Sequence, residues 1–349
     1  MPFEPTERVD LGRTGLRVTR LGFGAASIGG LYTAVSDADA IATVERAWEL
    51  GIRTFDVAPL YGYGAAERRL GAALADRPRD DFVLSTKVGR LVRRVDDIPA
   101  GADVDPQAID GRNDAYYVRT EPIRIVFDYS ADGVRRSIDE SLARLGLERI
   151  DIALIHDPDT HWAAAIGEAF PALARLREAG VIGAIGVGMN QSAMLARFAR
   201  EGDFDVFLLA GRYTLLDQDA LSELLPLCMT RGIAVLAGGV MNSGILADPR
   251  PGGRFDYLTA PPAVIDRARS LAAVCARHDV PLRAAAVQFP LAHPAIRSLI
   301  AGVRRVDHLD EYPELLRRPI PAALWADLRA EALIDPAAPV PGAAAGAAG

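Results

Sequence analysis

Short apolar runs alternate along the chain with longer stretches in which apolar residues recur every three or four positions. Runs rich in Val, Ile, Leu and Phe are typical of buried strands, and they lie at residues 18–22, 51–56, 82–87, 150–156, 181–187, 206–209, 233–237 and 298–301. The longer spacing predicts helices over residues 38–50, 65–75, 131–145, 163–179, 192–200, 219–231 and 263–278. Buried strands that alternate with helices predict a parallel sheet covered by helices.

The number of repeated units narrows the fold. Eight strand-like runs follow one another without a break in composition, which favours one α/β domain of the (β/α)8 TIM-barrel type over a two-domain Rossmann enzyme. Gly146 and Gly232 each follow a predicted helix, where a left-handed residue commonly ends a helix. We expect the barrel domain to cover residues 1–336, with a short β-hairpin over residues 8–19 in front of the first barrel strand.

Two segments depart from this alternation. Residues 89–128 form a long insertion after the third strand, rich in Asp, Arg, Pro and Tyr. Long irregular insertions are usually functional loops, and one that follows the carboxyl end of a barrel strand lies on the active-site face. Residues 337–349 are almost entirely Ala, Pro and Gly. Such a composition is too poor in packing groups to be ordered, so it predicts a disordered tail.

Titratable side chains end three of the predicted strands. Asp56 ends the run Gly-Ile-Arg-Thr-Phe-Asp, Lys87 ends Asp-Phe-Val-Leu-Ser-Thr-Lys, and His156 ends Arg-Ile-Asp-Ile-Ala-Leu-Ile-His. Tyr61 follows Asp56 in the next loop. Because the carboxyl ends of barrel strands converge on one face, we expect these four side chains to meet there.

These four residue types together fit proton-transfer chemistry. A free tyrosine has a pKa near ~10 and exchanges protons poorly at neutral pH, but an adjacent ammonium favours the phenolate. We therefore expect Lys87 to lower the pKa of Tyr61 and Asp56 to orient Lys87. His156 would donate a hydrogen bond to a substrate oxygen. Each residue alone is more often a salt bridge or a cap, and only their combination outweighs that interpretation.

Two other motifs allow different interpretations. Gly22-Phe-Gly-Ala-Ala-Ser resembles a dinucleotide fingerprint, but the loop does not run directly into a helix as that motif requires. His156 and His161 flank Asp-Pro-Asp-Thr, as in metal sites of barrel hydrolases, but the first strand offers no further His ligand. We expect a tight turn near a ligand at the first motif and no metal at the second.

Composition limits the partners and the compartment. A formal net charge of −7 argues against nucleic acid and anionic membranes as main partners. Cys228 and Cys275 are the two cysteines, and their apolar surroundings fit buried thiols. The amino terminus lacks the pattern of a signal peptide, and no apolar run reaches the ~18–20 residues that cross a bilayer. We expect a cytoplasmic protein with a small-molecule substrate, and nothing in the sequence predicts its oligomeric state.

Several strings in the chain resemble one known family, the aldo-keto reductases. They are Gly-Ile-Arg-Thr-Phe-Asp-Val-Ala-Pro-Leu-Tyr-Gly, Leu-Ser-Thr-Lys, Ile-His, Ile-Gly-Val-Gly-Met-Asn, Ser-Gly-Ile-Leu and Ile-Ala-Gly-Val-Arg. The resemblance runs from Leu11 to Leu328. It implies a (β/α)8 barrel that binds a nicotinamide cofactor without a Rossmann domain. It also implies a catalytic tetrad, which falls on Asp56, Tyr61, Lys87 and His156.

The resemblance further implies where the cofactor lies. The loop after the first strand would line the nicotinamide ribose, and Asn190 matches the family Asn that binds the carboxamide. Backbone N–H groups around Ser243 would approach the pyrophosphate, and residues 302–311 would surround the adenosine. The implied contacts are Gly24, Ala25, Ala26, Asp56, Asn190, Gly238, Asn242, Ser243, Gly244, Leu246, Gly302, Arg304, His308 and Glu311.

The chain departs from the family pattern near the nicotinamide. Gly238 and Gly239 stand where an aromatic ring often stacks on the cofactor. Ala210 stands where a Gln is common. We expect Tyr213 or Arg212 to fill that space.

The chain also departs from the pattern at the adenosine end. NADPH-dependent members use Lys and Arg to hold the 2′-phosphate, and the corresponding positions are Gly302 and His308. Loss of these cationic donors favours NAD over NADP, although Arg304 lies close enough in sequence to compensate.

Longer strings resemble one branch of the family, which includes L-fucose dehydrogenase and D-threo-aldose 1-dehydrogenase, with pyridoxal 4-dehydrogenase close to it. The strings are Gly-Phe-Gly-Ala-Ala-Ser-Ile-Gly-Gly, the insertion after Lys-Val-Gly-Arg, and Gly-Gly-Val-Met-Asn-Ser-Gly-Ile-Leu. They imply NAD(P)-dependent oxidation of an aldose, L-fucose or a relative, at C1 to the lactone. Pyridoxal oxidation, general aldehyde or ketone reduction, and a cofactor-binding regulatory subunit remain as alternatives.

Substrate contacts are expected around the tetrad. Tyr61 and His156 would contact the reacting oxygen. Trp162 follows His156 on the active face, where an aromatic ring either stacks on a sugar or serves in packing. Further aromatic candidates in the insertion are Tyr116, Tyr117 and Phe127.

Overall fold

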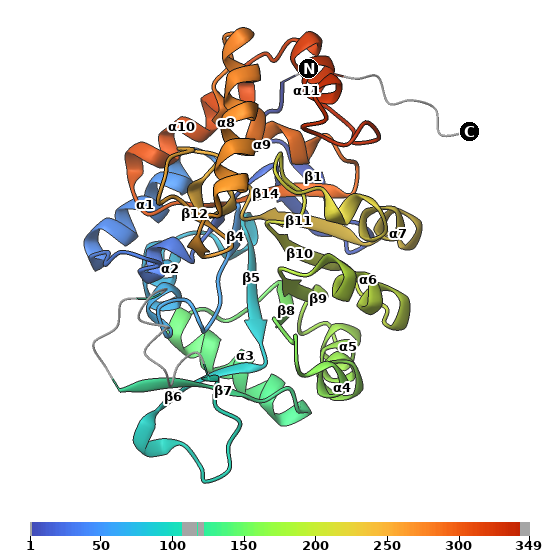
Figure 1. The fold of residues 1–349 in the computed structure, drawn as a ribbon. Coiled ribbons are helices and arrows are strands. Elements are labelled where there is room, and N and C mark those ends of the chain that lie inside the picture. The colour runs from blue at the N-terminus through green and yellow to red at the C-terminus, as the bar shows by residue number, and fades with distance from the viewer. Residues whose placement is uncertain (1, 107–116, 118–121, 343–349) are drawn as a thin grey trace.

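The computed structural model describes residues 2–106, 117 and 122–342 (Figure 1). Eight parallel strands close into a barrel in sequence order, as predicted. They are β3 (Leu21–Gly24), β4 (Thr54–Asp56), β5 (Val83–Val88), β8 (Ile152–His156), β9 (Ala184–Met189), β10 (Val206–Ala210), β11 (Ala234–Gly238) and β14 (Ile296–Gly302). The last strand pairs with the first, with Leu299 opposite Leu21, so the barrel strands leave no open sheet edge.

The predicted hairpin closes one end of this barrel. It consists of β1 (Arg8–Asp10) and β2 (Arg17–Thr19), which pair in antiparallel fashion. Leu11 and Val18 are fully buried and pack with the inward-facing side chains of the barrel strands. The carboxyl ends of the strands lie at the opposite end, and only that end is available for a site.

The first predicted strand, residues 18–22, is wrong in its boundaries. Residues 17–19 belong to the hairpin, and the barrel strand begins at Leu21. The Thr19 hydroxyl donates to the carbonyl of Leu21, and the Thr19 N–H donates to the hydroxyl of Thr54. These side-chain bonds replace strand pairing at the bend, so one apolar run serves two sheets.

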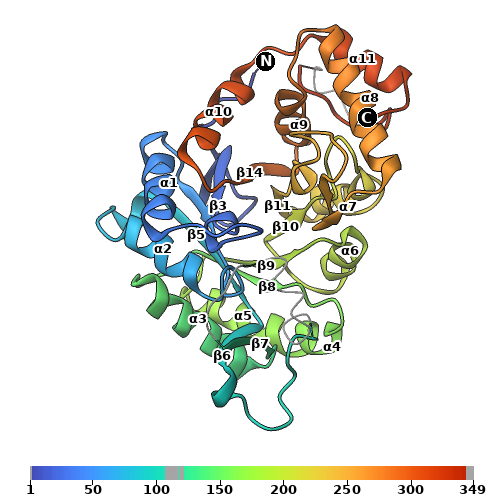
Figure 2. The ribbon, with the colours of Figure 1, turned by 60° about the vertical axis from the view of Figure 1, so that its left-hand side comes forward.

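Helices surround the barrel (Figure 2). The predicted ones are present as α1 (Asp37–Glu49), α2 (Ala65–Leu74), α3 (Ala131–Leu145), α6 (Ser192–Glu201), α7 (Leu224–Arg231) and α8 (Pro262–Arg277). The predicted helix over residues 163–179 is α4 (Trp162–Ala164), a π-helix (Ala165–Ala169) and α5 (Phe170–Glu178). The pattern missed α9 (Leu282–Leu291), α10 (Val306–Arg317) and α11 (Ala322–Ala330). Pro290 and Pro313 inside two of these helices hide them from a pattern-based prediction.

The insertion is more regular than expected. Its two ends form β6 (Arg90–Arg94) and β7 (Ile123–Phe127), which pair in antiparallel fashion from Arg90 opposite Phe127. This hairpin projects from one side of the barrel, away from α8 and α11 (Figure 1). The expectation of an irregular loop is therefore wrong for these residues, because the alternating apolar positions of β7 pack against β6.

The carboxyl-terminal segment packs further than composition predicts. Ala338 and Val340 are buried, and the Arg329 guanidinium donates to the carbonyl of Ala338 at 2.6 Å. A disordered tail beginning at residue 337 is thus wrong for residues 337–342, while residues 343–349 lie outside the described part. Among the described residues, none of the helices combines the length and the apolar content needed to span a bilayer.

Candidate active site

A buried ion pair lies at the carboxyl ends of β4 and β5. The Lys87 ammonium donates to the two carboxylate oxygens of Asp56 at 2.9 and 2.8 Å and to the carbonyl of Val57 at 3.0 Å. The side chains of Lys87 and Asp56 are 1% and 4% exposed, and the Ser85 hydroxyl donates to Asp56 at 3.0 Å. All three ammonium protons are therefore used, which is the condition under which a buried charge is tolerated.

The other two predicted residues lie directly against this pair. The Lys87 nitrogen lies 4.7 Å from the centre of the Tyr61 ring. The His156 ring meets the Tyr61 ring edge-on, with centroids 5.9 Å apart. The structure thus brings together the four residues that the strand ends predicted.

The pKa of Tyr61 moves in the direction opposite to the one we expected. Burial raises it well above the usual value of 10, and the Asp56 carboxylate raises it further. The expectation of a lowered pKa for Tyr61 is therefore wrong, and Tyr61 is a protonated phenol at neutral pH.

His156 is held in its neutral form. Burial lowers its pKa well below 6.5, and the positive charges of Arg90 and Lys87 lower it further. Its Nε2 lies 3.5 Å from a carboxylate oxygen of Asp157, whereas Nδ1 has no hydrogen-bond partner among the described residues. A carboxylate beside Nε2 favours the tautomer with the proton on Nε2. The imidazole can then donate a hydrogen bond from that atom.

A long cavity of about 750 Å³ leads away from the tetrad. Most of the predicted cofactor residues line it: Gly24, Ala26, Asp56, Asn190, Gly238, Asn242, Ser243, Gly244, Gly302, Arg304, His308 and Glu311. Ala25 and Leu246 do not line it, because both are fully buried. Their N–H groups instead donate to the carbonyls of Asp56 and Met241.

The walls of this cavity fit a nicotinamide dinucleotide. The volume lies within the ~300–1,000 Å³ of typical ligand sites. Asn242 lines the cavity and has a buried carbonyl oxygen without a partner among the described residues. A Cβ placed on Gly244 would meet no atom within 4 Å, so its backbone is open to a close ligand. A cavity lined by backbone and one unsatisfied amide suits a long polar molecule.

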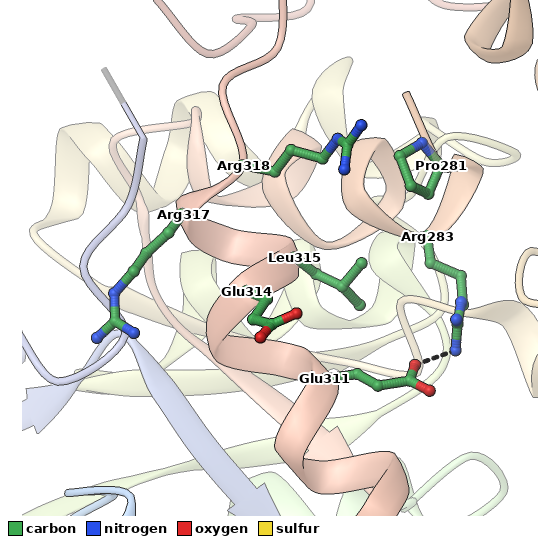
Figure 3. A pocket seen from close by; sticks show the side chains of 7 residues that line it. All are labelled: Pro281, Arg283, Glu311, Glu314, Leu315, Arg317 and Arg318. Atoms are coloured by element: carbon green, nitrogen blue, oxygen red, sulfur yellow. Dashed lines mark hydrogen bonds and ion pairs between the residues drawn. The ribbon is translucent and has the colours of Figure 1, made fainter. Parts of the chain in front are cut away.

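The far end of the cavity carries a charged pair, Arg283 with Glu311. Figure 3 shows the two side chains pointing toward each other at the rim of a neighbouring, smaller cavity of about 390 Å³. In that view Arg317 points the opposite way, where it binds both carboxylate oxygens of Glu4 at 3.0 and 2.6 Å. The arginines near the smaller cavity therefore do not converge on one point. Arg304 has no carboxylate partner among the described residues.

A short hairpin that the sequence did not predict covers part of the long cavity. It consists of β12 (Arg254–Phe255) and β13 (Leu258–Thr259), and Asp256 and Tyr257 form its turn with φ angles of 47° and 67°. Arg212 donates to both carboxylate oxygens of Asp256 at 2.8 Å, and the Asn190 amide approaches the Tyr257 hydroxyl at 3.5 Å. These contacts hold Tyr257 against the cavity that Gly238 also lines.

Two expectations about the space beside Ala210 are therefore wrong. Tyr213 is 2% exposed and packs on the rings of Phe289 and His293, away from the cavity. Arg212 is engaged by Asp256 and does not line the cavity either. Asp256 and Tyr257, in the turn of the β12–β13 hairpin, line the cavity together with Ala210. No local sequence motif predicts this contact between distant segments.

The aromatic residues predicted to contact the substrate have different surroundings in the structure. Trp162 is a packing residue: its ring lies 4.3 Å from that of Phe198 and stacks under the Arg197 guanidinium at 3.7 Å. The prediction that Trp162 contacts substrate is thus wrong, because α6 covers it. Tyr117 is buried and stacks on Tyr61 with centroids 6.2 Å apart. Phe127 packs on Tyr129 and His161 at the base of the insertion, and Tyr116 lies outside the described residues.

A phenol and a neutral imidazole above a buried acid–amine pair, beside a dinucleotide-sized cavity in a closed barrel, define a barrel oxidoreductase. The model of the Aldo/keto reductase family matches residues 20–331, and the chain belongs to this family, whose members use NAD(P)H. It is 45% identical to a D-threo-aldose 1-dehydrogenase from Pseudomonas sp, over 92% of this chain and 96% of the relative. It is 44% identical to a pyridoxal 4-dehydrogenase from Microbacterium luteolum, over 96% of this chain and 100% of the relative.

A solved structure supports the fold. The holo form of an aldo-keto reductase from Bacillus halodurans superposes with a TM-score of 0.71. The two share 24% sequence identity, over 95% of this chain and 97% of that one. At this identity the likeness establishes the (β/α)8 architecture, and the fold predicted from the alternation of strands and helices is confirmed.

The buried ion pair generates a stability prediction. Asp56→Asn leaves the Lys87 ammonium buried without a carboxylate, so we expect the free energy of unfolding to fall by about 3–5 kcal/mol. Adding Lys87→Met removes the stranded charge, so the double variant should lose less than Asp56→Asn alone. Urea unfolding followed by circular dichroism measures both. A loss below about 1 kcal/mol for Asp56→Asn, the value of an exposed pair, would contradict the buried geometry.

Proposed function

We propose that this protein oxidises the hemiacetal carbon of a small cyclic sugar, an aldose such as L-fucose, to the lactone, with NAD as the cofactor. The observation that carries this proposal is the position of Tyr61 and His156. Their rings meet edge-on beside the Asp56–Lys87 pair, and Tyr61 and Asp56 line the long cavity. A reacting oxygen held there contacts a proton acceptor and a hydrogen-bond donor at once.

The names of the two relatives near 45% identity support a common substrate chemistry. One is an aldose 1-dehydrogenase and the other a pyridoxal 4-dehydrogenase. Aldoses and pyridoxal share a structural property, since each has a hydroxyl that closes on its own aldehyde to form a cyclic hemiacetal. Loss of a hydride from such a carbon and of the proton from its hydroxyl gives a lactone in both cases. We therefore take a cyclic hemiacetal as the substrate class and an aldose as the substrate.

Each residue of the tetrad has a separate role in the proposed oxidation. A bound nicotinamide would supply the hydride acceptor. Tyr61, once ionised, takes the proton from the C1 hydroxyl, and the C–O bond becomes the lactone carbonyl. His156 donates from Nε2 to the same oxygen and orients it. Lys87, held by Asp56, keeps a positive charge beside the phenolate as it forms.

The choice of substrate is tested by a panel. We expect purified protein to reduce NAD with L-fucose or a stereochemical relative at a kcat/KM at least about tenfold above that with pyridoxal, a difference of ~1.4 kcal/mol in transition-state binding. The panel contains pentoses, hexoses, 6-deoxyhexoses and pyridoxal, each assayed with NAD and with NADP. Oxidation of pyridoxal alone would replace the aldose by the second candidate. Tight cofactor binding with no turnover on any compound would support a regulatory subunit.

The preference for NAD rests on Glu311. Its carboxylate lines the part of the cavity where we propose that the adenosine binds, and there it would accept from a ribose hydroxyl and repel a 2′-phosphate. Its partner Arg283 lines the same cavity. The Glu311 carboxylate therefore offsets the cationic donor that a 2′-phosphate would need.

Removal of this carboxylate should shift the cofactor preference. We expect Glu311→Ala to move the ratio of kcat/KM for NAD over NADP about tenfold toward NADP, because Arg283 is then released for a phosphate. Glu314→Ala is the matched control, since Glu314 lines the smaller cavity and not the long one. An unchanged ratio in Glu311→Ala, or an equal shift in Glu314→Ala, would contradict this role.

A further inference from the structure

Asp157, the residue after His156, has an unusual backbone. Its φ is +39°, in the left-handed region that residues other than glycine seldom adopt. Several bonds hold it there: its N–H donates to the carbonyl of Gly188 at 3.0 Å, and the Tyr129 hydroxyl donates to the carbonyls of His156 and Asp157 at 2.7 and 3.2 Å. Strain that surrounding contacts enforce is commonly found where a side chain must be aimed.

The Asp157 carboxylate is aimed at the reacting centre. One of its oxygens lies 3.5 Å from Nε2 of His156, the atom that would hold the reacting oxygen. The side chain remains 25% exposed, although His156 beside it is only 5% exposed. Burial is the main cause of the raised pKa of Tyr61 and of Tyr117. The negative charge of Asp157 raises the pKa of both groups further. The 3.5 Å contact with Nε2 of His156, whose ring meets the Tyr61 ring edge-on, places the Asp157 carboxylate beside the two rings that would hold the reacting oxygen.

Arg90 pairs with Asp157 but does not use all the hydrogen-bond acceptor positions of its carboxylate. The guanidinium lies 3.4 Å from a carboxylate oxygen of Asp157 and 3.3 Å from one of Asp105. Both distances are longer than the ~2.7–2.9 Å of a strong charge-assisted hydrogen bond. An ionised carboxylate has about four acceptor positions and no donor. Asp157 thus keeps the capacity to accept from a group that enters the site.

We propose that Asp157 accepts a hydrogen bond from the hydroxyl on the carbon next to the reacting one, and that it thereby selects hemiacetals with a vicinal hydroxyl. The inference rests on the proposed function, because His156 must hold the reacting oxygen. In an aldose the C2 hydroxyl lies one hydrogen-bond length from the C1 oxygen. A carboxylate beside Nε2 of His156 then meets that hydroxyl. A substrate without it leaves an acceptor position of this partly exposed carboxylate unfilled, and a polar group that loses its partner is a basis for discrimination between similar molecules.

The test combines a substitution at Asp157 with removal of the C2 hydroxyl from the sugar, each alone and both together. L-fucose and 2-deoxy-L-fucose, or the corresponding pair for the aldose that the panel selects, are assayed with wild type and with Asp157→Asn. In wild type we expect loss of the C2 hydroxyl to lower kcat/KM about 10- to 100-fold. In Asp157→Asn the same loss should be below about threefold, because the two changes remove one shared bond.

Asn is the suitable replacement, since it tolerates a left-handed φ as Asp does and Arg90 keeps Asp105 as a partner. Asp159→Asn is the matched control, an exposed carboxylate two residues along the same loop. We expect it to retain the wild-type response to the 2-deoxy sugar. If Asp157→Asn does not fold, as judged by its thermal transition and cofactor binding, Asp157→Ser takes its place in the same cycle.

The outcomes separate the two proposals. Equal losses with the 2-deoxy sugar in wild type and in the Asp157 variant would overturn the role of Asp157 and leave aldose oxidation standing. A wild-type protein that oxidises no aldose would overturn the proposed function and the role of Asp157 with it. A pairing with Arg90 alone would lower activity on both sugars by the same factor, which is the first of these outcomes.

Discussion

The buried contact between Lys87 and Asp56 is the constraint on which the rest of the site depends. Two opposite charges lie at the ends of adjacent strands with almost no exposure to water. Such a pair is costly to bury and is tolerated only when its geometry is nearly complete. Closure of the barrel meets this condition by fixing β4 against β5, and Ser85 and the Val57 carbonyl satisfy the remaining hydrogen bonds.

Burial around this contact also sets the protonation of its neighbours. It is the main cause that keeps Tyr61 protonated, with the Asp56 carboxylate adding to the effect, and it holds His156 neutral. The pKa values of these two groups are pushed in opposite directions, as in other sites where acid and base roles are separated by environment. In the proposed mechanism the phenol is the group that changes its proton, and the imidazole remains a hydrogen-bond donor throughout.

The sequence predicted those parts of the molecule that local patterns encode. Buried strands show as apolar runs, and the strand ends show as polar residues, so the barrel and the meeting of Asp56, Lys87 and His156 were readable. Helices α9 and α10 were missed because Pro290 and Pro313 interrupt their pattern. Contacts between distant segments left no local signal.

Two residues show the limit of such pattern-based prediction. Trp162 stands close to His156 in sequence but packs against α6. Closeness in sequence was therefore a poor guide to contact with the substrate. Asp157 stands next to His156 and was overlooked, because the placement of its carboxylate depends on a left-handed backbone and on Arg90 from the insertion. Side-chain direction at the end of a strand depends on backbone geometry, which composition and spacing do not report.

The central claim is that Tyr61 exchanges the proton during aldose oxidation, and its pH dependence tests this most directly. Because burial raises the pKa of Tyr61 well above 10, the phenolate is scarce at neutral pH. The rate of aldose oxidation should therefore rise with pH from 6 into the alkaline range, about tenfold per pH unit. Tyr61→Phe should lose turnover by a factor of about 10²–10⁴ and still bind cofactor. Near-normal turnover in that variant, or a rate that does not change with pH, would contradict the account.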